Sequence, residues 1–148
     1  MKKIILMVSI FVVSLSQAQI VNPVKWETSV LKISDTEADL IATATIDSTW
    51  HLYSQIIPED GPVPTSFTFE NNGKFLKKGN TIEEEGHIVS DPVFEMKIKY
   101  FENKTSFKQR IKLKSQEVFT VNATVEFMAC NDIQCTPPSE VELSFNVN

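Results

Sequence analysis

The sequence has 148 residues, which is enough for one domain with a hydrophobic core of its own but hardly for two. It carries 14 basic and 19 acidic side chains, a formal net charge of −5. Such an acidic chain would repel phosphate backbones and anionic lipid. The charge therefore argues against nucleic acid or a membrane surface as a partner.

The first residues have the layout of a secretory signal peptide. Two lysines precede an apolar run over residues 4–15, and small residues end this segment at Ala18. The run is shorter than the roughly 20 residues that a membrane-spanning helix needs, so no stable membrane insertion is expected. We expect cleavage near Ala18, a periplasmic or secreted location, and one domain over residues 19–148. Without residues 1–18 the chain has 12 basic and 19 acidic side chains, a net charge of −7.

Alternating apolar and polar residues dominate the rest of the chain. This period of two predicts strands that each have one buried face. The runs cover residues 38–47, 67–69, 94–100, 107–113, 119–127 and 141–147. The glycines and most prolines fall between the runs and mark turns. We expect an all-β fold, an antiparallel β-sandwich of eight or nine short strands, with long polar connections at residues 58–64 and 83–92.

The only two cysteines, Cys130 and Cys135, lie five residues apart near the end of the chain. On a straight strand they would be about 16 Å apart, whereas a disulfide needs Cα atoms about 5.5 Å apart. If they are bonded, the chain must turn between them, and Asn131 and Asp132 favour such a turn. Cys130 would then end a long strand over residues 118–129.

The spacing of the cysteines leaves several functions open. A bond between sheets of the immunoglobulin type needs cysteines far apart in sequence, so this pair cannot form one. Closing so short a loop stabilises the fold by only about 2 kcal/mol, which leaves a structural loop clamp and a redox-active pair as comparable alternatives. A binding module with a clamped loop is therefore the competing function. No metal-ligand spacing and no cofactor motif is present, and copper handling through Cys and Met is a minor alternative.

The segment "ACNDIQCTPPSEVELSF" (residues 129–145) resembles the N-terminal periplasmic domain of the thiol:disulfide interchange protein DsbD, where two nearby cysteines precede a Pro-Pro-Glu-like sequence. "WHLYSQ" (residues 50–55) and "DPVFEMKIKYFENKTSFKQ" (residues 91–109) extend the similarity. The resemblance implies an immunoglobulin-like fold and a component of thiol-disulfide oxidoreduction. By this likeness, Cys135 forms mixed disulfides with partners and Cys130 resolves them.

The resemblance also implies the partners of the domain. Members of this family accept reducing equivalents from a thioredoxin-like donor and pass them to other exported proteins. This chain ends at Asn148 without a membrane domain or a thioredoxin-like domain. We therefore expect the thioredoxin-like or membrane-embedded electron donor on a separate chain. Four residues separate the cysteines here, whereas the best-known relatives have five.

Four aromatic or polar positions, Phe94, Tyr53, His51 and Asp91, complete the expected site. Family members cover the reduced pair with a loop that bears an aromatic residue, and Phe94, in the segment that starts at Asp91, matches it. The residues alone favour a simpler interpretation, in which Phe94 begins the buried face of the run over residues 94–100. Tyr53 and His51 match aromatic positions near the family's site, or are ordinary strand residues.

The charges beside the cysteines are acidic. Asp132 and Glu140 are the charged neighbours in sequence, and carboxylates disfavour a thiolate. We expect the Cys135 thiol to be a sluggish nucleophile that becomes reactive in a specific complex. The acidic stretch at residues 83–91 is either a solvated loop or a surface that selects a basic partner.

Overall fold

The computed structural model describes residues 21–148, so the predicted signal peptide and its cleavage site near Ala18 lie outside the described residues. Residues 21–148 form eleven β-strands that pair antiparallel in three sheets. One sheet has the order β1 (Val24–Lys32), β2 (Glu37–Ile46), β8 (Lys104–Leu113), β5 (Phe75–Glu83). The second has the order β11 (Ser139–Val147), β9 (Phe119–Phe127), β4 (Ser66–Phe69). This part of the chain contains no helix of the length and apolarity that a membrane span requires.

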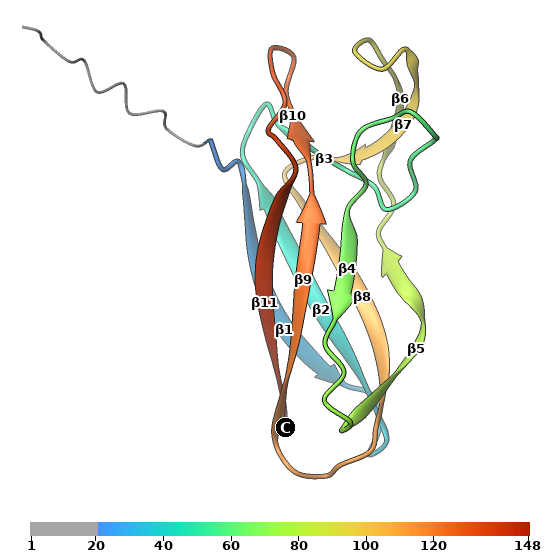
Figure 1. Cartoon of the computed structure of the whole chain (residues 1–148), viewed down its shortest axis with the longest axis vertical. Coiled ribbons are helices and arrows are strands. Elements are labelled where there is room, and N and C mark those ends of the chain that lie inside the picture. Colours follow the sequence, from blue (N-terminus) through green and yellow to red (C-terminus); the bar gives the residue numbers. More distant parts are fainter. Residues whose placement is uncertain (1–20) are drawn as a thin grey trace, which may run out of the picture.

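These two sheets pack face to face around one hydrophobic core (Figure 1). Aromatic rings join them: Trp26 of β1 lies 5.9 Å from Phe67 of β4 and 5.5 Å from Phe127 of β9, measured between ring centroids. The apolar residues of the alternating runs are the buried ones, as in β9, where every second residue from Phe119 is buried. The predicted all-β, immunoglobulin-like antiparallel sandwich is confirmed.

The structure has more strands than the eight or nine predicted, because strands with mostly polar residues lack the alternating pattern. The connection predicted at residues 83–92 contains β6 (His87–Asp91), so only residues 84–86 of its acidic stretch form a loop. Gly79, predicted to mark a turn, lies inside β5, where the register against β8 shifts between Lys78 and Ile82. Gly79 has a φ of 66°, which glycine adopts without the cost that a side chain imposes.

A third, smaller sheet closes one end of the sandwich, shown at the top of Figure 1. Its order is β10 (Ala129–Cys130), β3 (His51–Tyr53), β7 (Met96–Phe101), β6. Neighbouring residues of a strand point to opposite faces. Leu52 and Phe101 therefore belong to the main core, while Tyr53, Ile98 and Cys130 form a second cluster on the opposite face.

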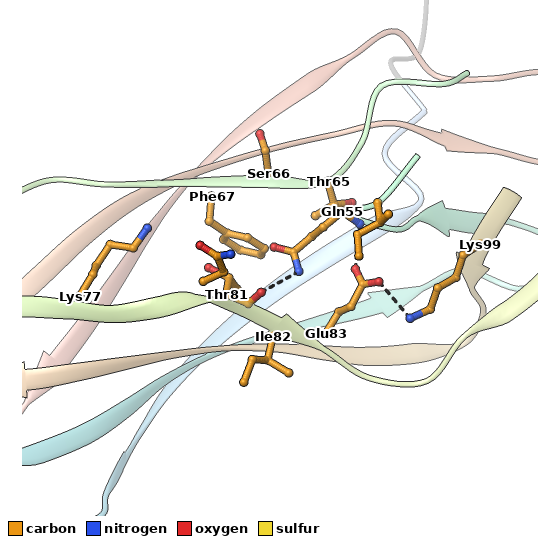
Figure 2. A pocket seen from close by; sticks show the side chains of 11 residues that line it. Gln55, Thr65, Ser66, Phe67, Lys77, Thr81, Ile82, Glu83 and Lys99 are labelled. Atoms are coloured by element: carbon orange, nitrogen blue, oxygen red, sulfur yellow. Dashed lines mark hydrogen bonds and ion pairs between the residues drawn. The ribbon is translucent and has the colours of Figure 1, made fainter. Parts of the chain in front are cut away.

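The segment after β3 is fixed by one buried carboxylate, that of Glu83, the last residue of β5. It accepts hydrogen bonds from the Ser54 hydroxyl (2.5 Å) and the Gln55 N–H (2.8 Å). Figure 2 shows its ion pair with the Lys99 ammonium, which lies 2.9 Å away. Burial alone would raise the pKa of Glu83, but these donors outweigh it and hold the pKa below its ordinary value. Glu83 thus ties β5 and β7 to the residues that directly follow Tyr53.

Replacing Glu83 with Gln should destabilise the domain by about 1–3 kcal/mol at neutral pH, because the Lys99 ammonium loses its partner in a site where the Glu83 side chain is only 8% exposed. A carboxyl whose folded pKa is lowered stabilises the fold above its unfolded pKa, and this contribution disappears as the pH falls through the folded pKa. The difference in unfolding free energy between wild type and Glu83→Gln should therefore shrink in acid. Urea unfolding at neutral and acidic pH measures it, with the exposed Glu85→Gln as control.

Candidate functional site

The two cysteines form a disulfide within a tight hairpin, residues 129–136, which we call the cysteine hairpin. Cys130 and Cys135 face each other as an antiparallel pair with Cα atoms 4.0 Å apart. The expected turn follows Cys130: the Asn131 N–H donates to the Gln134 carbonyl at 2.9 Å. The Asn131 side chain accepts from the N–H groups of Ile133 and Gln134, both at 2.9 Å. The turn therefore has its own hydrogen bonds.

The base of the hairpin is fixed by Thr136, which is buried. Its N–H donates to the Ala129 carbonyl at 2.8 Å, and its hydroxyl accepts from the Ala129 N–H at 3.2 Å. The tip points into solvent, with Ile133 91% exposed. Backbone and side-chain hydrogen bonds thus hold both ends of the loop that the disulfide closes.

The two sulfur-bearing residues differ in exposure. Cys130 lies in β10, is only 2% exposed and packs in the second cluster with Tyr53 and Ile98. Cys135 packs at the edge of this cluster and is partly exposed. An approaching molecule therefore meets Cys135 before it can reach Cys130.

Phe94 lies against the same cluster from the turn between β6 and β7. Its ring meets the Tyr53 ring edge to face at 6.2 Å. The Asp91 carboxylate fixes this turn, because Oδ1 accepts from the N–H groups of Val93 (2.8 Å) and Phe94 (3.1 Å). Phe94 packs in the same cluster as Met96, Ile98 and Tyr100, but it does not begin the strand, since β7 begins at Met96 and Phe94 belongs to the turn.

His51, Tyr53 and Asp91 form a hydrogen-bonded chain beside the disulfide. The His51 Nε2 lies 3.3 Å from the Tyr53 hydroxyl, which donates to Asp91 Oδ2 at 3.5 Å. The His51 ring also stacks on Tyr100, with centroids 4.5 Å apart. The six residues expected at the site therefore lie in or directly beside one cluster.

Burial is the largest influence on the pKa values of His51 and Tyr53 in this hydrogen-bonded chain. It raises the pKa of Tyr53 far above its ordinary value, and the neighbouring Asp91 carboxylate adds to the rise. Burial lowers the pKa of His51, and the carboxylates of Asp91, Glu102 and Asp132 oppose this only in part. The charged groups that act on His51 are all acidic, but burial outweighs them and favours the neutral ring.

Sequence reasoning missed Tyr100, which lines the site beneath His51. Tyr100 lies directly opposite both Tyr53 of β3 and His87 of β6. Its alternation with Ile98 signalled a strand face, but only the pairing of β3 with β7 places that face beside the cysteines. Its pKa is raised, first by burial and then by the nearby carboxylates.

A pocket of about 590 Å³ opens away from the cysteines, between β4 and β5 (Figure 2). It is lined by Gln55, Phe67, Thr81, Glu83 and Lys99 among others, and it contains neither the cysteines nor the residues of the second cluster. Within residues 21–148, no group of three or more His, Cys, Asp or Glu side chains is placed to hold a metal ion. The cysteine hairpin remains the chemically distinctive feature.

Comparisons with known proteins agree with this geometry in fold. The chain is similar to the N-terminal periplasmic domain of ScsB from Proteus mirabilis (11% identity, TM-score 0.55, covering 82% of this chain and 44% of that one). It is also similar to a Neisseria meningitidis complex of the DsbD and PilB N-terminal domains (10% identity, TM-score 0.51, 80% of each chain). The reduced N. meningitidis DsbD N-terminal domain matches at 12% identity and a TM-score of 0.47, covering 83% of this chain and 86% of that one.

Sequence comparison assigns the family. Among proteins of curated function, no significant match is found. The family described as "Thiol:disulfide interchange protein DsbD, N-terminal" matches residues 17–146, which is nearly the whole chain. The chain therefore belongs to the family of the N-terminal domain of the thiol:disulfide interchange protein DsbD.

Proposed function

We propose that this domain is an exported thiol-disulfide exchange module that cycles Cys130 and Cys135 between dithiol and disulfide. It accepts electrons from a thioredoxin-like or membrane-embedded donor on another chain and passes them to other exported proteins. Family membership supports thiol-disulfide interchange as the chemistry. For one relative, a complex between the DsbD and PilB N-terminal domains supports a protein partner.

The observation that carries the proposal is the self-sufficient cysteine hairpin. Asn131 holds its turn, and Thr136 makes two hydrogen bonds to Ala129 at its base. The disulfide adds only about 2 kcal/mol by loop closure. A clamp would duplicate what these hydrogen bonds already achieve, so the competing function, a binding module with a structural disulfide, has less support. Reduction leaves the hairpin its hydrogen bonds, as a reversible carrier requires.

In the proposed reaction the partly exposed Cys135 does the exchange with partners. Its thiolate attacks a partner disulfide and forms a mixed disulfide, and one partner sulfur leaves as a thiolate. Cys130 then attacks Cys135, which restores the internal disulfide and releases the reduced partner. The roles follow from exposure, since Cys130 is buried in the second cluster and Cys135 lies at its edge. Phe94 packs against the same cluster, and in the proposed mechanism its ring limits the access of other oxidants to the pair.

The reduction potential distinguishes a carrier from a clamp. A carrier should equilibrate at about −270 mV or less negative, within range of thioredoxin-like donors. Glutathione buffers followed by thiol trapping and mass spectrometry give the value. A potential below about −300 mV would mark a structural bond and favour the binding module.

Single cysteine variants should separate the two roles. With a nitrobenzoate disulfide, whose thiolate product is coloured, Cys130→Ser should react at least about tenfold faster than Cys135→Ser, because the remaining thiol is exposed in the first variant and buried in the second. Rates in denaturant serve as the reference, where the two thiols should react alike. Equal rates in the folded proteins would contradict the assignment.

Removing the Phe94 ring should expose the reduced pair. We expect Phe94→Ala to react with hydrogen peroxide several-fold faster than wild type, on the order of fivefold, since the thiols lose part of their cover. The matched control is Val93→Ala, which alters an exposed neighbour in the same turn. An unchanged oxidation rate in Phe94→Ala would show that the ring serves packing alone.

A further inference from the structure

His51 occupies a special place with respect to Cys130. Strand β10 pairs antiparallel with β3, and Cys130 lies directly opposite His51. Side chains of directly opposed residues leave the same face of the sheet, with Cβ atoms about 4.5–5.5 Å apart. The imidazole is therefore the titratable group that the sheet register places beside the buried sulfur.

The buried cysteine needs a proton acceptor. Once a partner is bound to Cys135, Cys130 must lose its thiol proton before it can attack, because the thiolate is the nucleophile. Cys130 is 2% exposed, so it has little access to water. The carboxylates of Asp91, Glu102 and Asp132 surround this region and disfavour a second negative charge. Lys97 and Lys99 alternate onto the other face of β7 from Ile98, away from the site.

The hydrogen-bonded chain sets the tautomer of His51. The single Tyr53 hydroxyl proton goes to the Asp91 carboxylate, which can only accept. The Tyr53 oxygen must then accept from His51, so Nε2 carries the hydrogen. In the neutral ring Nδ1 keeps its lone pair.

We infer that His51 is the general base for Cys130: its Nδ1 takes the thiol proton when Cys130 resolves the mixed disulfide. The inference rests on the proposed function. The Cys130 thiolate attacks the Cys135 sulfur, the bond between the two cysteines forms, and the bond from Cys135 to the partner breaks. The two cysteines are oxidised, and the partner sulfur leaves as a reduced thiolate. In the reverse direction the imidazolium returns the proton to Cys130.

The groups around His51 suit both of its charge states. Burial and stacking on Tyr100 favour the neutral ring that must accept the proton. The carboxylates of Asp91 on β6, Glu102 after β7 and Asp132 in the cysteine hairpin stabilise the imidazolium that results. His87 lies across β7, with its ring 6.1 Å from Tyr100 and its Nε2 3.9 Å from Glu102. His87 is thus an exposed histidine in the same sheet that suits a control.

Stopped-flow reaction of the reduced domain with the nitrobenzoate disulfide separates the two steps. The first coloured thiolate reports attack by Cys135, and the second reports resolution by Cys130. In His51→Gln and His51→Leu we expect the second phase to slow about 100-fold at pH 7, with the first phase unchanged. The wild-type second phase should fall in acid as His51 becomes protonated, and both variants should lose this inflection. His87→Gln should behave as wild type.

Three outcomes would overturn the role of His51. They are a second phase within about twofold of wild type, an equal slowing of both phases, and a slowed second phase that retains the wild-type pH inflection. Thermal unfolding of each variant checks that the fold is retained, and two different substitutions guard against a local packing defect. Failure of the proposed function is distinguishable, since the wild-type reduction potential would then lie in the range of structural disulfides whatever the two phases show.

Discussion

The site depends on the alternation of side chains in the small sheet (β10, β3, β7 and β6). One face of this sheet packs in the main core and the other packs in the second cluster. In β3, Leu52 points into the main core and Tyr53 into the second cluster, and Phe101 and Ile98 divide in the same way along β7. A slip of one residue would exchange the two faces and move Cys130 into the sandwich interior. The packing of Leu52 and Phe101 therefore fixes the register that places Cys130 opposite His51.

The surroundings of the cysteines make the reduced pair slow to react when no partner is bound. Acidic groups around His51 and burial of Cys130 both disfavour a thiolate, which is the reactive form of cysteine. An exposed thiol in a basic setting would react with any oxidant that reached it. Under the proposed function, reactivity would come from a bound partner, so selectivity would follow from the low intrinsic reactivity of the pair.

The sequence predicted the strands that show alternating apolar and polar residues. It did not predict features that depend on which strands pair and in which register. Regularly spaced apolar residues such as Leu40 and Val121, which are buried, were enough to predict β2 and β9. The fold class could be predicted from such strands. The polar β6 looked like a connection because only part of its pattern is buried. Phe94 was found by resemblance, but its place in a turn depends on backbone bonds to Asp91. Tyr100 became a site residue only through the register of three strands.

Asp91 links the two halves of the proposed mechanism. Its Oδ1 holds the backbone of the turn that carries Phe94, and its Oδ2 accepts the bond from Tyr53. Without the Asp91 acceptor, the Tyr53 hydroxyl is free to donate to His51 instead, which would favour the tautomer with its hydrogen on Nδ1. In the proposed mechanism Asp91 must therefore keep its bond to Tyr53 while the partner is bound to Cys135, so that His51 can accept the Cys130 proton.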